Sequence, residues 1–140
     1  MISIRPAILS DVEGLYSIDQ IARQTEERRE FIHDSVTDGT CLVAMAGKET
    51  VGYSVLNYAF YHQGCIDMLY VADGQRRRGV GTALLAAMEQ RCQTPKLFTS
   101  TNLSNLPMQS LLARNGYVLS GVIHNLDDSD PEIVYYKRLR

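Results

Sequence analysis

The feature that most constrains the fold is an abrupt change from strand to helix around a segment rich in arginine and glycine. Leu69-Tyr70-Val71 ends a β-rich run, and Arg76-Arg77-Arg78 leads into Gly79 and Gly81. Apolar residues then recur with the spacing of one helix face: Val80, Ala83, Leu84, Ala87 and Met88. Such a junction gathers the positive end of a helix dipole, unpaired amides and guanidinium groups. We therefore predict a phosphate or pyrophosphate site there.

Two other phosphate-binding motifs do not fit this segment. A P-loop needs a lysine followed by serine or threonine after its second glycine, whereas Gly81 is followed by Thr82-Ala83. A dinucleotide-binding fingerprint needs a third glycine and follows the first strand of its fold, whereas this segment follows a later strand. A run of solvated surface arginines is the plain alternative, but such runs are seldom placed at a strand–turn–helix junction.

The rest of the chain predicts a mixed α/β fold in one domain, residues 1–140, because strand and helix patterns alternate without a linker or repeat. Strands are expected at 2–5, 40–46, 50–60, 65–71, 96–101, 117–123 and 133–138. Helices are expected at about 10–19, at 26–38, after Gly79 and at 105–115. Ser10 and Glu13 match a capping box for the first helix. Residues 26–30 are expected to be exposed on the second helix.

Composition limits the partners of the chain. Fourteen basic and 16 acidic residues give a net charge of −2, so we expect no general attraction to nucleic acid or to anionic membranes. Cys41, Cys65 and Cys92 form no C-x-x-C pair, which favours three reduced thiols and no metal site. No segment has the leader or the apolar length of a membrane span. These observations favour a soluble cytoplasmic protein.

The segment from Leu69 to Gly81 resembles the acetyl-CoA motif of the GNAT N-acetyltransferases, in which Arg-x-x-Gly-x-Gly follows such a strand and opens an amphipathic helix. A second match is found later in the chain, where five residues fit the family's N-x-x-A-x-x-L-Y-x-K-x-G-F helix: Asn105, Leu111, Arg114, Gly116 and Tyr117. The order of expected elements is similar to that family over nearly the whole chain. The resemblance implies a mixed, mostly antiparallel, splayed sheet with helices on both faces.

The resemblance also implies a set of cofactor-binding residues for acetyl-CoA as co-substrate, without a metal: Leu69, Tyr70, Val71, Arg76, Arg77, Arg78, Gly79, Val80, Gly81, Thr82, Asn105 and Arg114. Backbone groups of Leu69 and Val71 would bind the pantetheine arm beside their strand, and amides of residues 77–82 would hold the pyrophosphate. Asn105 would contact the thioester end and Arg114 the adenosine end. The N–H of Val71 would polarise the acetyl carbonyl.

A general base is expected, because an amine acceptor is protonated at neutral pH and must lose a proton before it attacks. Asp67 is the carboxylate in the strand that leads to the cofactor motif, and the resemblance implies a catalytic role for it. A hydrogen-bonded strand residue without such a role is an equal alternative. Some relatives place the carboxylate in the next strand, where this chain has Ser100.

The proton donor to the departing thiolate is open. The family often uses a tyrosine of its later helix, and this chain has Leu112 there. Tyr70, which we take as the catalytic candidate, Tyr58, Tyr61 or a bound water would have to serve instead.

The function we predict is acetyl transfer from acetyl-CoA to a primary amine, on a small molecule or a peptide, by direct attack in a ternary complex. Alternatives are a CoA-binding regulatory domain without catalysis, which Leu112 keeps open, and acetylation of a protein N-terminus or an aminoacyl-tRNA. The near-neutral charge disfavours the tRNA. The chain has one acidic cluster, formed by Asp127, Asp128, Asp130 and Glu132. Its residues are typical of a turn, and the alternative is that the cluster attracts a cationic amine. The resemblance also favours a homodimer.

Overall fold

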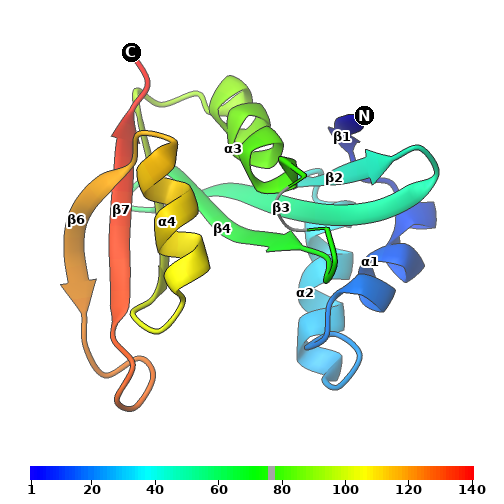
Figure 1. The fold of residues 1–140 in the computed structure, drawn as a ribbon, viewed down its shortest axis with the longest axis horizontal. Coiled ribbons are helices and arrows are strands. Elements are labelled where there is room, and N and C mark those ends of the chain that lie inside the picture. Colours follow the sequence, from blue (N-terminus) through cyan, green and yellow to red (C-terminus); the bar gives the residue numbers. More distant parts are fainter. Residues whose placement is uncertain (76–77) are drawn as a thin grey trace. The chain divides into compact units, whose positions relative to one another are not determined.

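The computed structural model describes residues 1–75 and 78–140, so that Arg76 and Arg77 of the predicted phosphate segment lie outside the described residues (Figure 1). The first half contains β1 (Ile2–Pro6), a 3₁₀ turn η1 (Leu9–Asp11), α1 (Val12–Ile18), α2 (Glu26–Thr37), β2 (Cys41–Ala46), β3 (Glu49–Phe60) and β4 (Gln63–Val71). The second half contains α3 (Val80–Arg91), β5 (Lys96–Asn102), α4 (Leu106–Arg114), β6 (Val118–Ile123) and β7 (Glu132–Arg138). None of the helices in these residues combines the length and apolarity needed to cross a membrane.

The strands form a mixed sheet in the order β1-β2-β3-β4-β5-β7-β6. β1 with β2, β2 with β3, β5 with β7, and β6 with β7 pair antiparallel, whereas β4 and β5 run parallel. The parallel ladder joins residues 64–66 of β4 to residues 97–99 of β5. The predicted fold class is therefore confirmed, and the strands and helices lie close to their predicted bounds.

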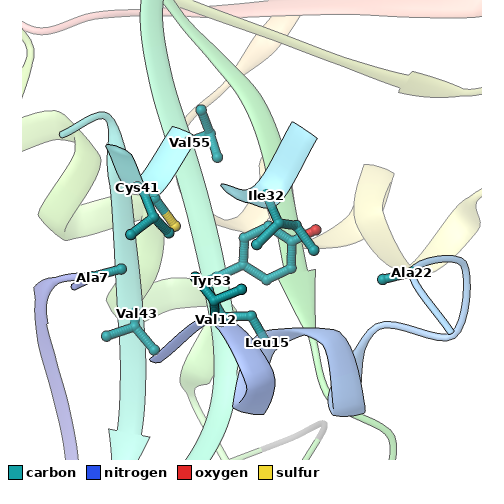
Figure 2. Packing of buried hydrophobic residues seen from close by; sticks show 10 residues of the cluster. Ala7, Val12, Leu15, Ala22, Ile32, Cys41, Val43, Tyr53 and Val55 are labelled. Carbon is teal, nitrogen blue, oxygen red and sulfur yellow. The ribbon is translucent and has the colours of Figure 1, made fainter. Parts of the chain in front are cut away.

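The chain divides into two compact units, of which the first comprises Met1–Leu56 and Met68–Met88. One face of its sheet packs against α1 and α2, where the core gathers around the buried ring of Tyr53 (Figure 2). The other face packs against α3 through Ala44, Val51, Val80 and Leu84. Helices thus cover both faces of the sheet in this unit.

Alternation over the last residues of β4 decides which side chains point to which face. Met68 and Tyr70 pack against the α1–α2 side, whereas Leu69 and Val71 pack against the α3 side, as the sequence predicted. Gly52 of β3 allows the close approach of these elements. A Cβ atom there would lie 2.7 Å from the carbonyl oxygen of Tyr70 and 3.0 Å from Val80, so only glycine fits without a shift.

The start of the first helix differs from the prediction. The capping box of Ser10 and Glu13 is wrong, because η1 precedes α1 and the acceptor is Asp11, whose carboxylate accepts the N–H of Ile8 at 2.8 Å. Arg5 binds the same carboxylate with two nitrogens, at 2.8 and 2.9 Å, and this hydrogen bonding lowers the pKa of Asp11. A carboxylate already held by an arginine is a stronger acceptor than a serine hydroxyl.

The second unit comprises Asn57–Asp67 and Glu89–Arg140. α4 packs on one face of its strands, where the hydroxyl of Tyr135 donates to Gln109 at 3.3 Å and Leu112 is completely buried. The end of α3 is tied to the same unit by Glu89, which accepts hydrogen bonds from Tyr117 at 2.9 Å and from Lys137 at 3.1 Å. These contacts fix the strands that carry Ser100 and Glu132.

Candidate functional site

The predicted phosphate segment lies at a true strand–turn–helix junction. After β4, the N–H of Ala72 donates to Val51 and the N–H of Gln75 donates to Ala72, at 2.9 and 3.1 Å. Gly79 has φ +80°, and α3 begins at the next residue, with the N–H of Ala83 donating to Gly79. The first turn of an α-helix has no intrahelical acceptors for its N–H groups and carries the positive end of the dipole. The junction therefore suits an anion.

Arg78 is the one arginine of the triplet within the described residues. Its side chain is exposed and its guanidinium donates to the side chain of Gln75. This contact places one positive charge beside the turn that leads into α3.

β4 supplies a backbone edge beside this junction. In the first unit the strands follow the order β1-β2-β3-β4, so that β4 is the last strand of that unit's sheet. The side chains of Leu69 and Val71 pack against the α3 core, which fixes the orientation of their backbone groups. An exposed strand edge offers N–H and C=O groups that bind an extended ligand as another strand would.

Tyr70 is held from two sides. Its hydroxyl accepts the N–H of Gln20 at 3.2 Å, and its ring stacks on that of Tyr53 with centroids 6.0 Å apart. The side chain of Gln20 also donates to Asp73, in the turn after β4. The loop between α1 and α2 is therefore bound both to the predicted catalytic tyrosine and to the segment that leads to the phosphate site.

A buried charge network supports that loop, and sequence reasoning missed it. Asp19 has no exposed surface, and its Oδ2 accepts hydrogen bonds from Arg28 at 2.8 Å and from the Tyr53 hydroxyl at 2.6 Å. Its Oδ1 accepts the N–H groups of Ile21 and Ala22 at 2.9 and 3.1 Å. Burial, reinforced by Asp19, raises the pKa of Tyr53, so that the phenol stays protonated. The exposure predicted for residues 26–30 is wrong at Arg28 and Arg29, which are half-buried.

The second unit carries the predicted general base and an unexpected second carboxylate. Asp67 is exposed on β4. Ser100, where some relatives would have a carboxylate, donates its hydroxyl to Glu132 of β7 at 2.7 Å. A carboxylate is therefore present beside Ser100 after all, supplied by another strand. The sequence places Glu132 at the end of an acidic loop and gives no signal of this contact.

The other predicted residues of this unit have structural partners. Asn105 caps α4, its side-chain oxygen accepting the N–H of Met108 at 3.1 Å. Arg114 is exposed in the last turn of α4 and donates to Ser110 at 2.7 Å. Leu112 is completely buried, so its position contributes neither a hydroxyl nor a surface group.

The remaining proton-transfer candidates also lie in this unit. Tyr58 accepts the N–H of Gln93 at 3.0 Å, and Tyr61 is 81% exposed in the turn after β3. Burial, with a smaller contribution from Asp67, raises the pKa of Cys65 to about 11. Cys65 is therefore a thiol at neutral pH, and this argues against nucleophilic catalysis by cysteine.

In the acidic loop, two carboxylates have a structural role. Asp130 accepts hydrogen bonds from the backbone N–H and the hydroxyl of Ser104, at 3.0 and 2.6 Å. Asp127 accepts one from Asn102 at 2.8 Å. These contacts favour the turn interpretation for both residues.

Comparison with known proteins agrees with this geometry. Residues 8–117 match the family model described as acetyltransferase (GNAT) family. A GNAT-family acetyltransferase from Bacillus cereus ATCC 10987 is 31% identical, with a TM-score of 0.92 over 99% of this chain and 97% of that chain. The comparison with curated proteins found no match.

Two more distant structures are similar in fold alone. The ribosomal-protein-S18-alanine N-acetyltransferase from Escherichia coli is 16% identical, with a TM-score of 0.80 over 99% of this chain and 94% of that chain. A putative streptothricin acetyltransferase from Bacillus anthracis, solved in complex with acetyl coenzyme A, is 20% identical, with a TM-score of 0.66 over 70% of this chain and 61% of that chain.

Proposed function

This chain belongs to the GNAT family of acetyltransferases, and we propose that it is a single acetyltransferase domain that transfers acetyl from acetyl-CoA to a primary amine. The observation that carries this proposal is the junction of β4, a positive-φ glycine and the first turn of α3, which suits a pyrophosphate. The acetyl coenzyme A held by the streptothricin acetyltransferase relative supports the same co-substrate here.

We assign the co-substrate to the residues that the family resemblance implies. Amides of residues 79–82 and the side chain of Arg78 would hold the pyrophosphate, and backbone groups of Leu69 and Val71 would pair with the pantetheine arm. The N–H of Val71 would polarise the acetyl carbonyl. Asn105 would donate from its amide nitrogen, since its oxygen caps α4. Arg114 would contact the adenosine end.

The residues would move two protons during direct attack. A carboxylate takes a proton from the ammonium group, the amine nitrogen forms a bond to the acetyl carbon, and the carbon–sulfur bond breaks. Asp67 is the first assignment for the base, and Glu132 is a second one because Ser100 donates to it. Tyr70 is the assigned proton donor to the thiolate, since Gln20 and Tyr53 fix its orientation.

A CoA-binding domain without catalysis is the second candidate, favoured by the buried Leu112 in the usual tyrosine position. Titration with acetyl-CoA followed by thiol release across a panel of amines separates the two. We expect a micromolar dissociation constant and thiol release on at least one amine. Binding of acetyl-CoA without thiol release on any amine would favour the second candidate. A failure to bind acetyl-CoA would refute both candidates.

A glycine pair supplies a matched test of the cofactor site. Gly79 and Gly39 both have positive φ, +80° and +76°, and a Cβ would meet nothing within 4 Å at either. Gly79→Ala and Gly39→Ala should each cost about 1–2 kcal/mol of backbone strain. Only Gly79→Ala should weaken acetyl-CoA binding, by about tenfold, because strain there shifts the anion-binding turn. Equal dissociation constants for the two variants would contradict the assignment.

We also propose a homodimer through β6. β6 is the last strand of the sheet and contains no charged residue. Its apolar side chains are exposed on both faces: Val118 55%, Leu119 62%, Val122 47% and Ile123 38%. An uncharged, apolar edge pairs readily with a copy of itself.

Light scattering after size exclusion should give twice the monomer mass of 15.7 kDa. Val122→Lys should give the monomer, because it places a charge at the edge. Ile8→Lys is the control, since Ile8 is 58% exposed in the first unit. A monomeric wild-type protein would refute the dimer.

A further inference from the structure

One face of the strands in the second unit bears a row of aromatic side chains. Phe98 of β5 pairs with Cys65 of β4 and with Tyr136 of β7, so these three side chains share a face. Tyr135, the neighbour of Tyr136, points to the opposite face, where it donates to Gln109 of α4. The row is therefore on the face of this unit away from α4.

The rings of the row contact one another. The centroids of Phe60 and Phe98 lie 5.2 Å apart, and those of Phe98 and Tyr136 lie 5.6 Å apart with the rings nearly parallel. Tyr61 extends the row with an edge contact to Phe60 at 4.9 Å. Phe60, Phe98 and Tyr136 are half-buried, so each ring keeps exposed surface. Together they form an apolar platform on which another ring can pack.

Carboxylates belong to the same group of strands. Ser100 lies two residues after Phe98 on β5, so alternation gives it the facing of the row, and the exposed Asp67 follows Cys65 on β4. Ser100 adds the carboxylate of Glu132 through its 2.7 Å hydrogen bond. An ammonium group would be attracted both by these carboxylates and by the faces of the rings.

We propose that the acceptor is a small primary amine that carries an aromatic ring, with the ring on the platform and the ammonium at the carboxylates. This inference rests on the proposed acetyl transfer. The ammonium gives one proton to Asp67 or Glu132, its nitrogen forms the amide bond with the acetyl carbon, and the carbon–sulfur bond breaks. The nitrogen loses a second proton, and the CoA sulfur leaves with the bonding electrons and takes up a proton, so the products are an aromatic amide and free CoA.

A small molecule fits this surface better than a peptide. A peptide chain is commonly bound through the backbone edge of a sheet, whereas the groups found here are side chains on a sheet face. Their chemistry is limited to stacking and to attraction of one positive charge.

The test compares thiol release with 2-phenylethylamine, n-butylamine and a short peptide with a free amino terminus. We expect kcat/KM for 2-phenylethylamine to exceed the other two by about tenfold or more, because stacking adds to apolar burial. Phe98→Leu and Tyr136→Leu should reduce the preference over butylamine by about threefold or more. Both substitutions keep apolar volume, and circular dichroism checks their folding. Tyr135→Leu, on the opposite face, should leave the preference unchanged.

The outcomes separate this inference from the proposed function. If acetyl-CoA binds and butylamine or the peptide is acetylated as well as phenylethylamine, the aromatic acceptor is refuted and the acetyltransferase stands. The same holds if the preference survives in both Phe98→Leu and Tyr136→Leu. If acetyl-CoA does not bind, both proposals fail together.

Discussion

Arg28→Met should lower the free energy of unfolding by about 3 kcal/mol, because it leaves the carboxylate of Asp19 buried without its counter-charge. Asp19 has no exposed surface and accepts the Arg28 guanidinium at 2.8 Å. Methionine has a similar length and fills much of the same space, so the loss reports the missing charge more than a cavity. Since small proteins are stable by about 5–15 kcal/mol, urea denaturation followed by circular dichroism would resolve the change easily.

The exposed pair of the same unit gives the control. Arg5 binds Asp11 at 2.8 Å, but its side chain is 43% exposed, against 19% for Arg28. Arg5→Met should therefore cost less than about 1 kcal/mol. The double variant Asp19→Asn with Arg28→Met should be more stable than Arg28→Met alone, since it removes the uncompensated charge. Equal losses for Arg28→Met and Arg5→Met would show that burial of Asp19 does not govern this network.

The fold was readable from the sequence because its signals are local. Alternation placed Met68 and Tyr70 on one face of β4 and Leu69 and Val71 on the other, and the structure confirms both. The spacing from Val80 onward predicted α3 after Gly79. Such patterns depend on neighbours within one or two turns, so a single segment contains the information.

The contacts that shape the candidate site were not readable, because they join residues far apart in the chain. Tyr53 and Asp19 are 34 residues apart, and Ser100 and Glu132 are 32 apart. Residue spacing within one segment does not reveal which strands are neighbours in the sheet. The sequence therefore predicted Glu132 only as part of an acidic turn. The predicted capping box of Ser10 and Glu13 was wrong for a related reason. Arg5 lies in the preceding strand and binds the carboxylate of Asp11.

Asp67→Asn should lower kcat/KM for the amine by about 10²- to 10³-fold at pH 7 and leave the acetyl-CoA dissociation constant unchanged. A general base contributes this much when the amine must lose a proton before attack. The defect should shrink as the pH rises toward about 10, because solvent then deprotonates an alkylamine, whose pKa is similar to that of lysine. A wholly structural role for Asp67 would give a defect that does not depend on pH.

Glu132→Gln decides between the two carboxylates that the structure offers for this step. If Ser100 and Glu132 form the base, Glu132→Gln should show the large, pH-dependent loss and Asp67→Asn a small one. Asp128→Asn is the matched control, because Asp128 is an exposed acid of the same loop. A large loss in Asp128→Asn would mean that the negative charge of the loop attracts the cationic amine, which raises KM and leaves kcat unchanged. Full activity in both Asp67→Asn and Glu132→Gln would exclude a carboxylate base and leave water as the proton acceptor.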